Sequence, residues 1–262
     1  MNVSVALRVM TYNLLRGGRP DRLPAIMSVI TDARPDVLAL QELGAMTARR
    51  FAGFGADLGM RGRMSTSWFG QPVGILVRDA VTIRHGGRVR RPFHHGAPVL
   101  TIDTSLGPLT VLAAHLHPLS GRRRLREARW LAAYAGRRRP ALLLGDLNSL
   151  DPWDDHARRL ADLRHRYRGR HLRRDGTVDT RAIAALVGAG FVDVFRRTGS
   201  VGRPYTAPTE GPWGAEFSRM RLDYVLATEE LAARARTCHT LDTNASDHYP
   251  VVADFDVEPG PG

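Results

Sequence analysis

The chain has 262 residues, 43% of them hydrophobic, which is typical of a globular protein with a sizeable core. Its formal net charge is +12 and all of its basic residues are arginine, which favours attraction to polyanions. A single cysteine, Cys238, excludes an intrachain disulfide and a cysteine-based zinc cluster, so any bound metal must use oxygen or histidine ligands.

The first half of the chain is dominated by predicted strands. Apolar patterning predicts a strand over 6–14, an amphipathic helix over 22–33 that ends before Pro35, and a strand over 36–42. Two more strands are expected at 72–78 and 80–86. Residues 98–118 are typical of a hairpin whose second strand carries His115 and His117.

The second half alternates helices and strands. Helices are predicted over 121–139 and over 179–190, the latter closed by glycines, and strands over 141–148, 221–227 and 249–257. The sequence contains neither an internal repeat nor a long Pro/Gly/Ser linker. We therefore expect one domain, residues 1–262, with many strands close enough for antiparallel pairing.

The expected location follows from two further features of the sequence. No stretch approaches the roughly 18 consecutive apolar residues of a membrane span. The start, MNVSVALRVMTYN, lacks the basic, apolar and small-residue regions of a signal peptide. The sequence as given predicts a cytoplasmic protein without a membrane span, and a monomer is assumed.

Polar side chains stand at the ends of several apolar strands. Asp146 and Asn148 close the run LLLGDLN, and being two residues apart they lie on the same side of an extended chain. A strand ending in a turn explains this pair taken alone, because Asp and Asn both favour turns. However, Asn13, Glu42 and Asp247 are similarly placed beside other apolar runs. The recurrence indicates a shared cause.

These polar residues resemble, in order and context, the motifs of the endonuclease/exonuclease/phosphatase superfamily. That group includes deoxyribonuclease I, the exonuclease III type repair nucleases, neutral sphingomyelinases and inositol polyphosphate 5-phosphatases. The residues that carry the resemblance are Asn13 in TYNLLRGG, Glu42 in LALQE, His115 in LAAHLHP, Asp146 and Asn148 in GDLN, Asp223 in RLDYV, and Asp247 with His248 in SDHYPV. The match runs from about residue 8 to about residue 256.

The resemblance implies a fold of the α+β class. We expect a four-layer α/β/β/α sandwich, in which two packed, mostly antiparallel sheets are flanked by helices. Apolar strands would then be buried inside the sandwich, and their polar ends would meet in one cleft on a rigid scaffold.

The chemistry implied is metal-dependent hydrolysis of a phosphoester. A hard divalent cation with carboxylate ligands offsets charge on the phosphoryl oxygens and stabilises the departing alkoxide. We expect Mg²⁺, or Mn²⁺ in its place, with Glu42 as the principal ligand, Asn13 beside it and Asp247 as a further ligand or a ligand of a second site. Asn148 would donate to the phosphoryl group or complete the metal shell. Asn13 taken alone is also compatible with a simple turn.

The remaining motif residues are expected to activate water and contact the phosphate. Asp146 would orient or deprotonate the attacking water. His248 would hydrogen-bond to Asp223, which holds its tautomer and favours its charged form, and His115 would face the phosphate from the opposite side. A surface ion pair between Asp223 and Arg221 is the structural alternative.

One departure from the family pattern concerns His115. Members similar to deoxyribonuclease I pair the histidine at this position with a glutamate from an earlier strand, whereas residues 69–80 here contain no Glu. This argues against His115 as general acid and favours water or a metal-bound hydroxyl. His117 is expected to be structural or to line the cleft, and His94 and His95 are expected on a solvated loop.

An arginine-rich segment, residues 156–176, follows the GDLN strand directly. Its candidate substrate-binding residues are Arg164, Arg166, Arg168 and Arg170. They are suited to tracking a nucleic-acid backbone or to gripping a compact polyphosphorylated molecule. A solvated amphipathic helix is an equally good interpretation of this segment.

The sequence therefore predicts a Mg²⁺-dependent phosphoester hydrolase, with a nuclease or other phosphodiesterase as the leading subclass. The alternative is a phosphatase or phosphodiesterase acting on a lipid, an inositol phosphate or another small organophosphate. A third interpretation is a catalytically dead nucleic-acid-binding protein. The intact set of motifs argues against the third, because binding alone does not require Glu42, Asp146 and His248 together.

Overall fold

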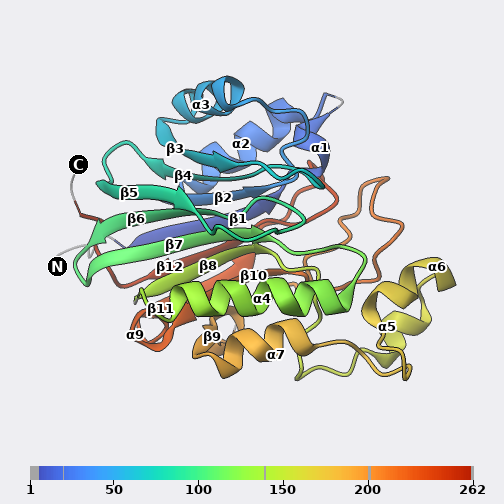
Figure 1. Cartoon of the computed structure of the whole chain (residues 1–262). Coiled ribbons are helices and arrows are strands. Elements are labelled where there is room, and N and C mark those ends of the chain that lie inside the picture. The colour runs from blue at the N-terminus through green and yellow to red at the C-terminus, as the bar shows by residue number, and fades with distance from the viewer. Residues whose placement is uncertain (1–5, 20, 139, 200–201, 261–262) are drawn as a thin grey trace.

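Two six-stranded sheets pack face to face between layers of helices in the computed structural model, as Figure 1 shows. The structure describes residues 6–19, 21–138, 140–199 and 202–260. Each sheet is antiparallel except for one parallel pair at its centre, β1 with β2 in the first sheet and β7 with β8 in the second. The predicted four-layer sandwich is confirmed.

The first sheet contains both the N-terminal strand and the last strand of the chain. Its order is β11 (Ala235–Thr240), β12 (Val251–Phe255), β1 (Leu7–Asn13), β2 (Val37–Gln41), β4 (Val73–Arg78) and β3 (Met60–Ser65). The second sheet is built from the middle of the chain. Its order is β5 (Ile83–Arg88), β6 (Pro98–Thr104), β7 (Gly107–His115), β8 (Ala141–Asp146), β10 (Asp223–Thr228) and β9 (Phe191–Asp193).

Helices cover the outer face of each sheet (Figure 1). The first sheet is covered by α2 (Leu23–Ala33) and α3 (Ala48–Asp57), and the second by α4 (Gly121–Ala135) and α7 (Arg181–Gly188). The short helices are α1 (Leu15–Gly18), α5 (Ala157–Ala161), α6 (His165–Arg168), the 3₁₀ turn η1 (Gly169–His171), α8 (Val194–Arg197) and α9 (Glu229–Ala232). No helix in the described part of the chain is long and apolar enough to cross a membrane.

The apolar run Leu142–Leu144 shows why the central strands are continuously hydrophobic. Leu142 and Leu144 face the core between the two sheets, whereas Leu143 packs under α4 and α7. Alternate side chains of β8 therefore enter two different cores, and all six residues of the strand are buried. The strand is consequently held on both faces up to its last residue, Asp146.

The structure corrects three sequence-based expectations about secondary structure. The strand expected at 80–86 lies instead at Ile83–Arg88. Strands β3 and β11 and helix α3 were not predicted, because their apolar periodicity is interrupted by exposed arginines and glycines. Residues 156–176 do not form one amphipathic helix; they form α5, α6 and η1, separated by turns.

Candidate active site

The strand register brings three polar residues of the second sheet into one row. Asp146, the last residue of β8, lies opposite His115 of the parallel strand β7 and opposite Asp223 of the antiparallel strand β10. Side chains directly opposite on neighbouring strands are close enough to interact. The ends of three strands distant in sequence thus form one cluster around Asp146.

The first sheet contributes Asn13 and Glu42 to the same place. Asn13 ends β1 and pairs in register with Gln41, so Glu42 follows at the adjoining strand end. The Asn13 amide donates across the gap between the sheets to Asp146 Oδ2 (3.1 Å), and it lies 3.5 Å from Glu42 Oε1. The residue predicted to lie beside the metal ligand therefore bridges Glu42 and Asp146.

Glu42 is held in an unusual backbone conformation. Its φ is 53°, a left-handed value that costs a non-glycine residue about 1–3 kcal/mol. The carboxylate accepts hydrogen bonds from Gln71 Nε2 (2.9 Å) and from the backbone N–H of Arg16 (3.3 Å). Asn148 has a similar φ of 47°. Such outliers cluster at functional sites, where the surrounding structure fixes a side chain against local preference.

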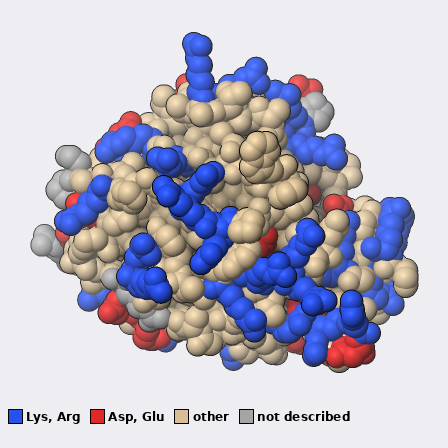
Figure 2. Space-filling view, in the orientation of Figure 1, with Lys and Arg blue, Asp and Glu red and all other residues tan. Residues whose placement is uncertain are grey.

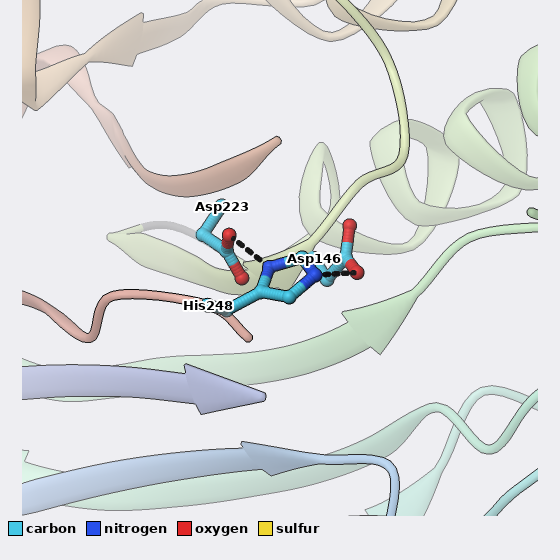
Figure 3. Close-up of side chains that lie close together, drawn as sticks. All are labelled: Asp146, Asp223 and His248. Carbon is cyan, nitrogen blue, oxygen red and sulfur yellow. Dashed lines mark hydrogen bonds and ion pairs between the residues drawn. The ribbon is translucent and has the colours of Figure 1, made fainter. Parts of the chain in front are cut away.

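His248 lies between two carboxylates, as Figure 3 shows. Its Nδ1 is 2.7 Å from Asp223 Oδ2, and its Nε2 is 3.9 Å from Asp146 Oδ2. Burial by itself disfavours the charged ring, but attraction and hydrogen bonding to Asp223, with further attraction to Asp247 and Asp146, raise the pKa of His248 well above its usual value. The predicted Asp223–His248 hydrogen bond is present, and Asp223 favours the charged form of the ring.

Among the described residues, Glu42 and Asp247 form no ion pair, and Asp146 is paired only with the histidines His115 and His248. Burial and then repulsion by Asp223 raise the pKa of Asp146, with a further contribution from Glu42. Burial also raises the pKa of Asp247, and the charge of Glu42 adds to this in spite of attraction to His248. The carboxylates of Glu42, Asp146 and Asp247 are thus crowded together, and their oxygens are the donor set that a hard divalent cation prefers. The residues present therefore fit a bound divalent metal.

Asp146, Asp223 and His248 also offer ligand atoms within 4.8 Å of one another, close enough to share a metal ion. A metal on this group would require a neutral His248 with a free nitrogen. The raised pKa and the hydrogen bond to Asp223 oppose that state.

The expectation of a solvated loop is wrong for His95. Its side chain is buried, and its ring stacks on that of His115 at a centroid distance of 3.9 Å with 3° between the planes. His95 Nδ1 accepts the N–H of Gln71, the residue whose side chain holds Glu42. The neighbouring histidine, His94, for which the same expectation was made, is only partly buried. His95 was missed because nothing in a loop sequence indicates which side chain folds inward.

His115 has no carboxylate partner of the deoxyribonuclease type among the described residues. Its Nδ1 has no hydrogen-bond partner there, and its Nε2 lies 3.4 Å from Asp146 Oδ2. Burial, followed by repulsion from His248 and His94, lowers the pKa of His115 to about 3. The ring is therefore neutral at physiological pH, which agrees with the argument against His115 as general acid.

Glu127 of α4 is a buried residue that sequence reasoning missed. Its two carboxylate oxygens accept the backbone N–H groups of His94 and His117, both at 2.7 Å, and so fix the His94–His95 segment beside β7. Burial raises its pKa to about 7. The available signal was that Glu127 is the lone acidic residue of the Arg-rich stretch 121–139. His117 is buried and structural, as expected: its Nδ1 accepts two backbone N–H groups.

Arg221 does not pair with Asp223. Its guanidinium is buried and donates to Asp193 Oδ2 (2.6 Å) and Asp151 Oδ2 (3.2 Å). The alternative of a surface ion pair with Asp223 is therefore wrong. The backbone N–H of Asp223 instead donates to Thr206 Oγ1 (3.2 Å), which anchors β10 where its carboxylate meets His248.

The predicted substrate-binding arginines lie on the lobe formed by α5, α6 and η1, which projects at the right of Figure 1. Arg168 donates to the carbonyl oxygens of Ala161 and Leu163 and so closes the turn after α5. Arg166 and Arg170 lie over the Tyr167 ring. Arg164 is exposed. Arg164, Arg166 and Arg170 are thus accessible, whereas the Arg168 side chain is engaged in hydrogen bonds within the lobe.

Comparison with known proteins identifies the family. The endonuclease/exonuclease/phosphatase family model matches residues 10–248, which is most of the chain and includes all of the motif residues. The chain belongs to the endonuclease/exonuclease/phosphatase family. Its members are phosphoester-hydrolysing enzymes, for which dependence on a divalent metal is typical. A comparison with curated proteins finds no significant match.

Solved structures of this family share the fold at low sequence identity. An AP endonuclease from Archaeoglobus fulgidus is 22% identical over 95% of this chain and 99% of its own, with a TM-score of 0.69. A Neisseria 3′ phosphatase bound to a product DNA hairpin is 19% identical over 95% and 99%, with a TM-score of 0.67. D. rerio TDP2 complexed with a single-strand DNA product is 16% identical over 96% and 99%, with a TM-score of 0.65.

Proposed function

We propose that the chain is a divalent-metal-dependent phosphodiesterase that cleaves nucleic acid, with Mg²⁺ as the metal and Mn²⁺ as a substitute. The observation that carries the proposal is the buried cluster in which His248 lies between Asp223 and Asp146, beside the crowded carboxylates of Glu42 and Asp247. Such a cluster is costly to bury unless a cation and an anionic substrate complete it.

In this proposal Glu42 is the principal metal ligand, with Asn13 beside it and Asp247 as a further ligand. The metal, when bound, offsets negative charge on the phosphoryl oxygens. The strained backbone at Glu42 and the hydrogen bond from Gln71 fix the carboxylate before the metal arrives. Asn13 helps to fix the carboxylates of Glu42 and Asp146 through its side-chain contacts to both.

The second sheet supplies the groups that act on water and on the phosphate. Asp146, whose pKa is raised by burial, is suited to orient the attacking water and accept its proton. Imidazolium His248 faces the phosphoryl oxygens with a positive charge, and Asp223 keeps that charge in place. Asn148 donates to the same oxygens or completes the metal shell. Neutral His115 contributes a hydrogen bond from the opposite side.

The structural neighbours support nucleic acid as the substrate. Those named above act on AP sites in DNA or were solved with DNA products. The net charge of +12 favours the same polyanionic class. The alternative, a hydrolase of lipids, inositol phosphates or small organophosphates, would use the same catalytic cluster with a different surface around it.

A substrate panel tests the proposed function. We expect the purified protein to cleave plasmid DNA or RNA, and a generic aryl phosphodiester, with Mg²⁺ and not with EDTA, in preference to sphingomyelin and inositol phosphates. Asp146→Asn protein serves as the control for contaminating nuclease. Preferred hydrolysis of a lipid or inositol phosphate would establish the alternative, and nucleic-acid binding without any hydrolysis would show a catalytically dead protein.

The arginines of the α5–α6 lobe give a separate prediction about substrate contact. Arg164, Arg166 and Arg170 are replaced together by Gln, and Arg168 is kept because it closes the turn after α5. Each phosphate contact adds about −0.9 to the slope of log affinity against log salt for duplex DNA, so we expect a slope flatter by up to about 3.

Binding to duplex DNA is measured at several salt concentrations, with aryl phosphodiester hydrolysis as the control for an intact site. An unchanged slope would show that the lobe is a solvated surface. A raised KM for an inositol polyphosphate, with weak DNA binding in the unsubstituted protein, would show instead that these arginines hold a compact polyphosphate.

A further inference from the structure

A second basic region, remote from the α5–α6 lobe, lies between the edge of the second sheet and α4. It is a groove of about 860 Å³. Its walls come from β3, β5, the segment after β5 and the C-terminal half of α4. The arginines that line it are Arg63, Arg88, Arg90, Arg91, Arg137 and Arg138. Figure 2 shows basic side chains spread over this face of the molecule.

The charge of this groove is not neutralised within the described residues. All six arginines are exposed, and none forms an ion pair with a described acidic side chain. None of the described residues that line the groove is acidic. Like charges on a concave surface reinforce one another's potential, and that potential attracts anions. Six cations along one groove fit an extended polyanion better than a single phosphate.

The groove continues toward the catalytic cluster. Trp130 lines both the groove and a smaller cavity of about 260 Å³ whose other walls include Pro92, His94 and His117. His95, which follows His94 in the chain, stacks on His115, and His115 Nε2 is 3.4 Å from Asp146 Oδ2. The segment that follows β5 therefore runs from the arginine groove to the centre of the site.

Aromatic side chains accompany this path. Trp130 is half-buried on α4, and Phe69, which lines the smaller cavity, is 74% exposed. The adjacent Trp68 is 98% exposed. Solvent-exposed aromatic rings beside a basic groove form the arrangement on which unpaired bases stack, whereas the bases of a duplex are already stacked on one another.

We propose that this groove, called here the Arg88–Arg138 groove, binds the backbone of a single-stranded nucleic acid that extends from the catalytic cluster, with bases stacked on Phe69 and Trp68. The inference rests on the proposed nuclease function and adds the form of the substrate. A concave groove of this kind fits a flexible strand, whereas a planar anionic membrane would not reach its floor.

The test compares two variants with equal charge loss. The groove variant replaces Arg88, Arg90 and Arg137 with Gln; the control variant replaces the exposed Arg49, Arg129 and Arg234, which do not line the groove. Binding of labelled oligothymidylates of about 6 and about 30 nucleotides is measured in EDTA across a range of salt. Each phosphate contact on a single strand adds about −0.7 to the salt slope, so the groove variant should flatten the slope for the longer strand by about 2.

The short strand, which cannot span the groove and the cluster together, should lose much less affinity. Hydrolysis of the aryl phosphodiester with Mg²⁺ should be unchanged in both variants. Phe69→Ala should weaken binding of the longer strand without altering the salt slope, because stacking involves no phosphate.

Several results would overturn the inference. Equal flattening by the control variant would show an effect of net charge alone. An equal loss for duplex DNA would contradict the single-stranded specificity, and groove-dependent binding to phosphatidylserine vesicles without strand binding would assign the groove to a membrane. If the unsubstituted protein hydrolyses the aryl ester but binds no strand, the groove assignment fails while phosphodiesterase chemistry stands. If the unsubstituted protein binds the strand but does not hydrolyse the aryl ester, the groove assignment stands and the proposed phosphodiesterase function fails.

Discussion

Glu42→Gln protein is expected to lose metal-dependent hydrolysis of the aryl phosphodiester by more than about 100-fold, since even groups that merely orient a metal ligand contribute about 10- to 100-fold. A neutral amide binds a hard cation far less well than a carboxylate. The fold should survive, because Glu42 stands at a strand end and its oxygens accept hydrogen bonds that the Gln carbonyl can partly keep.

The melting temperature without metal should therefore not fall in this variant. Removing one charge relieves the repulsion that raises the pKa of Asp146 and Asp247. Activity is measured over a range of Mg²⁺ and Mn²⁺ concentrations, and Glu230→Gln, on the exposed surface of α9, is the matched control. Full activity at every metal concentration would show that Glu42 is not the principal ligand and would assign the metal to the Asp146–Asp223–His248 group.

Asp146→Asn and His248→Ala are each expected to lower kcat by about 10²- to 10⁴-fold, the usual range for a positioned acid–base group. The double variant should lose far less than the product of the two, because both side chains act on one transition state and contact each other. Asp223→Asn should reproduce most of the His248→Ala loss, since Asp223 holds the charged ring.

Matched controls for this cycle are Asp57→Asn, at the end of α3, and His239→Ala on β11. Single-turnover hydrolysis separates the chemical step from substrate binding. Losses that multiply in the double variant would mean that Asp146 and His248 act in separate steps. A normal kcat in Asp223→Asn would remove that residue from the assignment.

The residues that gather at the candidate site could be predicted from the sequence to a large extent. Asn13, Glu42, Asp146, Asp223 and His248 stand at strand ends in recognisable local motifs, and the structure brings them together. Strand periodicity and motif order are local properties, so a single sequence displays them. The four-layer fold followed from the same motifs through family resemblance, and the comparisons agree with it.

The supporting residues could not be predicted in this way. Gln71, His95 and Glu127 lie in loops or on a helix with no motif of their own, yet they hold Glu42 and the histidine segment beside His115. Their roles depend on which side chains fold inward when α4 packs on the second sheet. The same is true of Arg221, whose partners come from segments 28 and 70 residues away.

The sequence by itself determined which reactive groups the protein carries and the order in which strands present them. Only the tertiary structure decided that Asp146 lies opposite both His115 and Asp223, that Asp223 raises the pKa of His248, and that arginines from β3, β5 and the segments after β5 and α4 line one groove. The physical reason is that register, burial and the packing of two sheets set these distances. Each of them depends on contacts between residues far apart in the chain, and no local pattern records such contacts.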